Sequence, residues 1–278
     1  SSVSTQDASD DANDPGWSAY NGPMTPGVGY AGMGAGLVSF SGTPNNGNIN
    51  VPLFYTAFDN TYTQTSPGTP FNLVGNPYPS AISAVTLLAN NPDVDGTIYF
   101  WNDDNSGGTD YARTDFAYWN GTGGLGSTAT GPTPTGYIGT AQGFLVRALS
   151  GSSVLNFTNA QRVAANNTQF HRVGSEDSRL WFSVQNGELF NQVLIGMLED
   201  ATEDEDRLYG AVKMYGNPDI ALAAVANGID HAILAFPTSS VERMVPLTVK
   251  VTEPGVYIFK ANTMENFESF HVYFQDTE

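Results

Sequence analysis

The chain has 278 residues with an ordinary apolar content, which is enough for one large domain or two smaller ones. Its net charge is −18 with only 10 Lys and Arg, which excludes nucleic acid as a partner because phosphates need a positive field. No apolar run is long enough to span a bilayer, so direct membrane insertion is not expected either. Cysteine is absent, which excludes disulfides, thiolate metal sites and a cysteine nucleophile.

The composition changes twice along the chain. Residues 1–16 are polar and rich in Asp, which predicts a flexible acidic lead-in before Trp17. The first Glu of the chain is Glu176, all three Lys follow it, and 24 of the 30 Gly precede it. This shift predicts two domains, a Gly/Asn/Thr-rich β domain over 17–175 and a β-sandwich domain over 176–278.

The fold class follows from short alternating apolar stretches that are separated by Gly, Pro, Asn and Asp. Such a pattern favours strands joined by turns, so we predict an all-β protein with two β-sandwich-like domains. One or two short helices are expected, over residues 81–89 and, as a helical turn or two, over 221–226.

A strand, a rigid turn and a short helix are predicted in the first domain. Residues 71–74 end a strand, and two prolines then fix the backbone, because each sets its own φ and holds the preceding residue extended. Ser80 is predicted to cap the helix that follows. The turn is interpreted as an architectural corner rather than a binding loop. It is formed by Gly75, Asn76, Pro77, Tyr78, Pro79 and Ser80.

Closely spaced acidic residues make calcium the strongest candidate cofactor. The oxygen-rich loop at 103–110 is the first candidate site, and the acidic loop at 200–206 is the weaker one, because Ca²⁺ prefers carboxylate and amide oxygens. Neither loop has EF-hand spacing, so solvated turns remain the alternative. The candidate ligands are Asp103, Asp104, Asn105 and Asp110 in the first loop, and Asp200, Asp204 and Asp206 in the second.

Aromatic residues lie on both sides of the first acidic loop. Such side chains could form a platform on which sugar rings stack, but strand alternation turns about half of them into a core. A glycan-binding face and ordinary core packing therefore both remain open. The candidate sugar-binding residues are Tyr99, Trp101, Tyr111 and Trp119.

No set of residues indicates catalysis. His171, His231 and His271 have no metal-ligand spacing, and no nucleophile elbow is present. Any two of the 28 acidic residues could be paired, so carboxylates alone do not support a glycosidase. We therefore expect a protein that is not an enzyme and has no catalytic residues.

Several stretches together resemble a region of large secreted and cell-surface proteins of Bacteroidetes, especially flavobacteria, which the type IX secretion system exports. The motif Gly-Asn-Pro-Tyr-Pro-Ser at 75–80 is the most specific of them. The matching segments run in order along most of the chain. They are residues 29–32, 40–47, 72–80, 98–101, 141–146, 179–181, 194–196, 206–209 and 272–274.

The resemblance implies an extracellular or outer-surface location, an all-β architecture, and an adhesive or structural role within a longer, filament-like assembly. Regions of this kind usually continue with further strands after the stretch at 272–274, so the resemblance implies that the second domain is incomplete at its C-terminal end. The domain is then either a cut fragment or one whose open sheet edge accepts a strand from a neighbour. The expected partners are other copies or neighbouring domains, joined by strand addition, and glycans. Two alternatives stay open, a carbohydrate-binding module of a secreted polysaccharide-degrading protein and an acid-catalysed glycoside hydrolase. An exposed aromatic strip would favour the first, and a cleft with two facing carboxylates the second.

Overall fold

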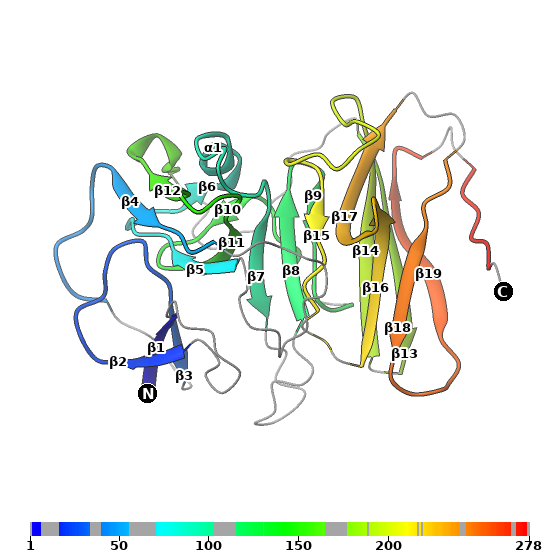
Figure 1. The fold of residues 1–278 in the computed structure, drawn as a ribbon, viewed down its shortest axis with the longest axis horizontal. Coiled ribbons are helices and arrows are strands. Elements are labelled where there is room, and N and C mark those ends of the chain that lie inside the picture. Colours follow the sequence, from blue (N-terminus) through cyan, green and yellow to red (C-terminus); the bar gives the residue numbers. More distant parts are fainter. Residues whose placement is uncertain are drawn as a thin grey trace.

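The computed structural model describes residues 2–6, 17–33, 40–55, 71–102, 115–129, 131–164, 177–187, 189–215, 217, 219–238, 243–267 and 271–276. The chain is mostly β, with 46% strand and 5% helix, as the sequence predicts (Figure 1). Among the described residues, no helix combines the length and the apolar character that crossing a membrane would need.

The strands up to residue 164, here called the first unit, form four small sheets. The central one has five strands in the order β5 (Phe71–Gly75), β11 (Gly143–Arg147), β7 (Ile98–Asn102), β8 (Asp115–Asn120) and β9 (Gly123–Leu125). Around it lie the pair β4 (Ile49–Pro52) and β12 (Val154–Phe157), the pair β6 (Ile82–Ser83) and β10 (Tyr137–Ile138), and the triplet β2 (Trp17–Tyr20), β1 (Ser2–Gln6) and β3 (Tyr30–Met33). The helices are α1 (Ala84–Ala89) and the short 3₁₀ helix η2 (Asn159–Gln161).

The strands from residue 177 onward, here called the second unit, form one seven-stranded sheet that curls into a half-barrel. Its order is β18 (Leu247–Val251), β16 (Ile220–Ala226), β17 (Ile229–Pro237), β14 (Leu189–Leu198), β13 (Ser178–Asn186) and β19 (Ile258–Glu265), with β15 (Ala211–Val212) paired to β17. All described pairings are antiparallel except β14 with β17, which is parallel. Each sheet lies wholly on one side of the predicted boundary near residue 175.

Three sequence predictions about local structure differ from the fold. The helix α1 begins at Ala84 and is capped by Ser83, whose hydroxyl accepts a hydrogen bond from the Thr86 N–H at 3.3 Å, so the prediction of Ser80 as the cap is wrong. Ile82 and Ser83, which the prediction places in the helix or next to its start, pair with β10 instead. The alanine-rich segment at 221–226 belongs to strand β16, because its position between β18 and β17 overrides a weak helix propensity.

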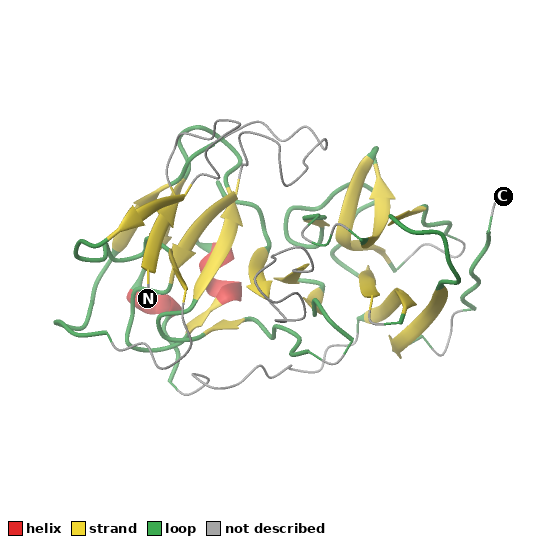
Figure 2. Cartoon of the chain, turned by 90° about the horizontal axis from the view of Figure 1, so that it is seen from below, coloured by secondary structure: helices red, strands yellow, loops and turns green. Residues whose placement is uncertain are grey.

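The N-terminal end of the chain also departs from the prediction. Ser2–Gln6, within the segment expected to be a flexible lead-in, forms strand β1 between β2 and β3. Residues 271–276 carry no strand, although Phe274 stacks on Phe259 with ring centres 4.8 Å apart. In both views the N-terminus lies within the first unit, and the C-terminal tail lies at the opposite end of the molecule (Figures 1 and 2).

The central sheet of the first unit is buried on both faces. On β7, Ile98 and Phe100 point into the core of the first unit, while the alternate residue Tyr99 points into a core that also contains Leu194 and Ile233 of the second unit. A strand that is covered on both sides must be apolar almost continuously, which explains the run at 98–101. The two units therefore share a hydrophobic core.

This shared core is built on a ladder of aromatic rings. The rings of Phe71, Tyr99 and Tyr118 meet edge to face, with centres 5.0 Å apart for the first pair and 5.4 Å for the second. Such tilted pairs are favourable because the positive edge of one ring meets the negative face of the next. From the second unit, Ala211, Met214 and Ala232 also belong to this core.

Candidate functional site

The Gly-Asn-Pro-Tyr-Pro-Ser motif forms a corner that ties together four parts of the first unit. The buried Asn76 amide donates hydrogen bonds to the carbonyls of Ser80 at 2.8 Å, Gly139 at 2.9 Å and Ile138 at 3.2 Å. Its Oδ1 accepts the N–H of Tyr78 at 3.0 Å. Asn76 thus closes the turn on itself and fixes it against β10.

The other residues of the motif extend these contacts. The Tyr78 ring is 1% exposed, and its hydroxyl donates to the carbonyl of Gly47 at 2.6 Å. The guanidinium of Arg162 lies over that ring at 5.3 Å and donates to Ser80 Oγ at 3.0 Å. Ser80 therefore holds Arg162 rather than capping the helix, and the motif acts as a structural anchor.

Replacing Asn76 with alanine is expected to lower the free energy of unfolding by about 2–3 kcal/mol, because three carbonyls and one N–H lose their partner in a buried site. Chemical denaturation of the full chain measures this change. The matched control is Asn21→Ala, at an exposed asparagine, which should change stability by less than about 0.5 kcal/mol. Equal effects of the two substitutions would contradict the structural role of the motif.

The predicted sugar-binding residues do not share one face. Tyr99 is completely buried, so its assignment to an exposed face is wrong, because its side of β7 packs on the second unit. Trp119 is half-buried against the core of the first unit, whereas Trp101 is 46% exposed. Tyr111 lies outside the described residues.

The first predicted calcium loop, with Asp103, Asp104, Asn105 and Asp110, lies outside the described residues. In the second loop, the Asp206 carboxylate accepts the Thr202 N–H at 2.6 Å. Over the part of the chain that the structure describes, no group of three or more His, Asp or Glu side chains is arranged to hold a metal ion.

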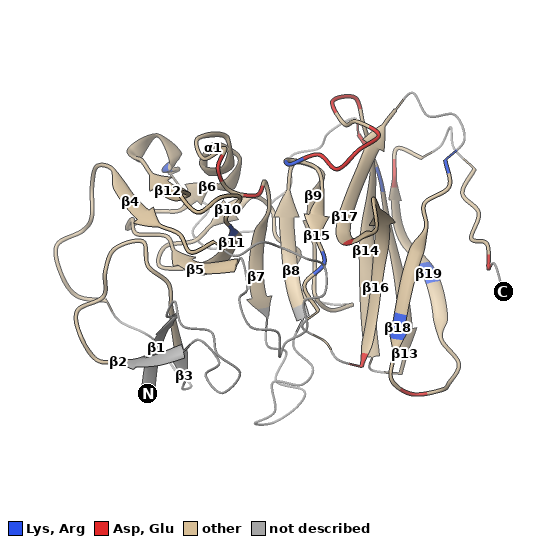
Figure 3. Cartoon of the chain, viewed as in Figure 1, with Lys and Arg blue, Asp and Glu red and all other residues tan. Residues whose placement is uncertain are grey.

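The most connected polar site lies where the two units meet, around residues 199–215, here called the junction segment. This segment follows β14, contains the acidic stretch at 199–206 that Figure 3 colours largely red, and leads into β15. Its backbone is held by side chains of the first unit. The Thr97 hydroxyl donates to the Gly210 carbonyl at 3.0 Å, and the Thr122 hydroxyl donates to the Tyr209 carbonyl at 2.8 Å.

Arg207 of the junction segment reaches into the first unit. Its guanidinium donates to the carbonyls of Val94 at 2.7 Å and Leu88 at 3.3 Å, the second of which lies in the last turn of α1. A cation at the C-terminal end of a helix satisfies carbonyls that have no partner within the helix. The backbone of Gly96 lies directly against Arg207, as its missing side chain allows.

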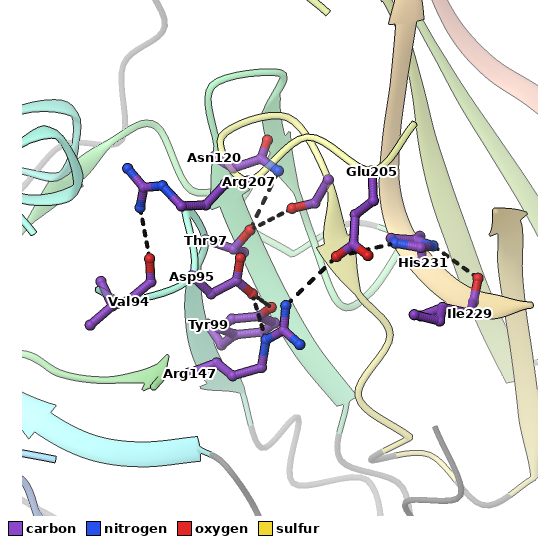
Figure 4. Close-up of polar contacts among 11 residues, drawn as sticks. Val94, Asp95, Thr97, Tyr99, Asn120, Arg147, Glu205, Arg207, Ile229 and His231 are labelled. Carbon is purple, nitrogen blue, oxygen red and sulfur yellow. Dashed lines mark hydrogen bonds and ion pairs between the residues drawn. The ribbon is translucent and has the colours of Figure 1, made fainter. Parts of the chain in front are cut away.

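Below Arg207, four ionisable side chains form a chain of contacts across the junction (Figure 4). Asp95 accepts hydrogen bonds from the Tyr99 hydroxyl at 2.7 Å and from Arg147 Nε at 3.1 Å. The same guanidinium lies 3.7 Å from Glu205 Oε1, which in turn lies 3.7 Å from His231 Nε2. Asp95 and Arg147 belong to the first unit, and Glu205 and His231 belong to the second.

His231 is the most deeply buried of these four side chains. The side chain is completely buried, and its Nδ1 lies 2.9 Å from the carbonyl of Ile229, so Nδ1 carries the proton and donates. Its Nε2 has no hydrogen-bond partner among the described residues, since 3.7 Å to Glu205 exceeds hydrogen-bond length. The contact with Glu205 is an ion pair only when Nε2 also carries a proton.

Burial and neighbouring charges shift the pKa values of the two carboxyl groups in this site in opposite directions. The His231 ring lowers the pKa of the Glu205 carboxyl, and the Arg147 guanidinium adds to this effect, while partial burial opposes it. Burial raises the pKa of Asp95, although Arg147 and the Tyr99 hydroxyl act against the rise. The junction therefore holds one carboxylate stabilised by its neighbours and one that is costly to bury.

The Glu205→Gln variant should be less stable than the wild type at neutral pH by roughly 1 kcal/mol or less, because the carboxylate is partly exposed. A lowered folded-state pKa adds stability above the unfolded-state pKa of about 4.3, and this stability is lost as the pH falls through the folded-state value. Thermal melts from pH 7 down to pH 3 should thus show the two curves converging at the acidic end.

The control for this experiment is Glu253→Gln, at an exposed position, which should follow the wild type at every pH. A difference between Glu205→Gln and the wild type that stays constant down to the lowest pH would show that the carboxylate charge is not what stabilises the junction.

The sequence did not predict this site, since its members lie at 95, 147, 205 and 231 without any local spacing. One local signal was available, the single arginine that ends the apolar strand Gly143–Arg147. A family model described as a domain of unknown function, DUF8693, matches residues 12–278. No curated protein and no solved structure matches the chain.

Proposed function

We propose that this chain, which belongs to the DUF8693 family, is a non-enzymatic structural and adhesive module of a secreted or surface-attached bacterial protein. The proposal combines the sequence resemblance with one structural observation, the interlocked junction between the two units. A module that transmits load between its two ends needs units that do not move or unfold separately.

The junction supports this role through both its core and its hydrogen bonds. Tyr118 accepts the Met214 N–H at 3.1 Å and donates to the carbonyl of the same residue at 3.2 Å. Trp181 Nε1 donates to the Gly124 carbonyl at 3.0 Å, and Gln192 Nε2 donates to the Gly126 carbonyl at 2.9 Å. Together with the shared aromatic core, these contacts join the two sheet systems directly.

Single-molecule force spectroscopy on the full chain, held at its two ends, tests the mechanical part of the proposal. We expect one extension event that releases both units, because neither can unfold without exposing the shared core. Two well-separated events, with one unit opening at low force, would overturn it. Antibody labelling of intact cells that make the protein tests its location, and labelling only after permeabilisation would contradict a surface role.

The partners that we propose are other copies or neighbouring domains, joined by strand addition at the outer strands β18 and β19. These two strands end the seven-stranded sheet, and both carry exposed apolar side chains. The exposed fractions are 40% for Val249, 41% for Val251, 54% for Ile258 and 54% for Met264. Exposed apolar edge strands are templates for pairing with another chain.

Hydrogen exchange and sizing of the purified chain at increasing concentration test this pairing. Backbone amides of β19 should become protected as larger species form. A monodisperse protein whose edge amides exchange freely at every concentration would show that these edges do not pair.

A further inference from the structure

Two buried side chains of the second unit, those of Lys213 and Asn191, are in contact with each other, and this contact does not connect the two units. Lys213, directly after β15, is 4% exposed, and Asn191, on β14, is 1% exposed. Lysine is rarely buried to this extent. The Lys213 Nζ donates a hydrogen bond to Asn191 Oδ1 at 3.0 Å. An amine and an amide carbonyl are thus held together in a site that water does not reach.

The surroundings fix both groups in place. Asn191 Oδ1 also accepts the backbone N–H of Leu222 at 3.0 Å, so the amide oxygen has a backbone donor aimed at it. The backbone N–H of Lys213 donates to the Asp230 carbonyl at 2.8 Å, which fixes the base of the lysine side chain. The aromatic ring of Tyr118 covers the amine, with its centre 5.7 Å from Nζ.

We propose that Lys213 and Asn191 form an intramolecular isopeptide bond, which links the junction segment covalently to strand β14. Lysine amines act as nucleophiles towards carbonyl carbons. Since a carbonyl bond is about 1.23 Å long, the Asn191 Cγ lies within about 4.2 Å of Nζ. Reacting groups that are held so close gain a large rate advantage over free ones.

The reaction needs no other reactant. The ammonium group of Lys213 gives up one proton to water during folding, before the site closes, and the lone pair of Nζ then adds to Cγ while the carbonyl electrons move onto Oδ1. The Leu222 N–H stabilises the negative charge that develops there, as one donor of an oxyanion hole does. A second proton passes from Nζ to Nδ2, the Cγ–Nδ2 bond breaks, and ammonia leaves. An amide between Nζ and Cγ remains.

The position of this bond suits it to resist mechanical load. The strand that contains Asn191 belongs to the middle of the seven-stranded sheet, and Lys213 lies within the junction segment, whose backbone is hydrogen-bonded to the first unit. A covalent link between them would keep the junction segment on the sheet under load. The inference goes beyond the proposed function and does not depend on where the protein is located.

Mass spectrometry of the purified, folded full chain tests the bond. The intact mass is expected to be lower than the sequence mass by one ammonia, and a protease digest should contain a branched peptide that joins the segments around Asn191 and Lys213. Trypsin should fail to cleave after Lys213. An intact mass equal to the sequence mass, with normal cleavage after Lys213, overturns the proposal.

A matched pair of variants identifies the residue responsible. Lys213→Arg keeps the positive charge but has no primary amine, so the ammonia loss should disappear. Lys260→Arg, at an exposed lysine, should keep it. If Lys213→Arg does not fold, the branched peptide of the wild type alone decides the matter.

Succinimide formation at an Asn-Gly pair also releases ammonia, and the chain contains such pairs, for example Asn186-Gly187 and Asn227-Gly228. A succinimide reopens in mild base and yields no branched peptide. A mass deficit that mild base removes by adding water, with no branched peptide in the digest, therefore counts against the isopeptide bond.

Discussion

Replacing Gly96 with alanine is expected to destabilise the whole chain by about 3 kcal/mol or more, the largest effect of any single methyl group that we predict. A Cβ at this position would lie 2.0 Å from the Arg207 carbonyl oxygen, 2.6 Å from its carbonyl carbon and 2.7 Å from Leu208 Cα. All three are backbone atoms, so no side-chain rotation can relieve the contact. The junction segment would have to move away from the first unit.

That displacement should break specific contacts and not only lower stability. The hydrogen bonds from Thr97 to Gly210 and from Arg207 to Val94 span the same place, so they should be lost together. Chemical denaturation measures the stability, and hydrogen exchange of the junction segment measures the local opening. Gly151→Ala is the control, because its nearest neighbour would be 4.0 Å away in ordinary contact. Similar losses at Gly96 and Gly151 would show that the units are not in close backbone contact.

The sequence predicts strands well where alternation is strong, but it does not predict what each face meets. The apolar, aromatic run at 98–101 has the strand-forming composition on which the all-β prediction rests, and it forms strand β7. Its composition could not reveal that Tyr99 packs on the second unit, because alternation assigns a residue to a face and not to a partner. The same limit explains why a sugar-stacking face was expected where Tyr99 is in fact buried.

Other differences arise because non-local pairing decides local structure. The segment at 221–226 is rich in alanine and favours a helix locally, yet two strands flank it in the sheet. The parallel pairing of β14 with β17 requires a long crossover, and the junction segment supplies part of it. The ionic site at the junction follows from that crossover, so a sequence interpretation based on hairpins could not find it.

Removing the Asp95 carboxylate is the second substitution for which we expect a large effect. Asp95→Ala should lower the free energy of unfolding by about 3–5 kcal/mol, because it leaves the Arg147 guanidinium largely buried without its closest anion. The Tyr99 hydroxyl, which is completely buried, loses its acceptor as well. The exposed neighbour Asp93 provides the control, since Asp93→Ala should change stability by less than about 0.5 kcal/mol.

A double-mutant cycle separates the ion pair from simple loss of packing. If the main cost of Asp95→Ala is the uncompensated charge of Arg147, then adding Arg147→Met should recover part of the stability, because an apolar side chain has no charge to be solvated. The double variant should thus be less destabilised than the sum of the two single variants by at least about 1 kcal/mol. Strictly additive losses would show that Asp95 and Arg147 act independently. The junction would then be held mainly by its aromatic core and its other hydrogen bonds, since the remaining link from Arg147 to Glu205 spans 3.7 Å.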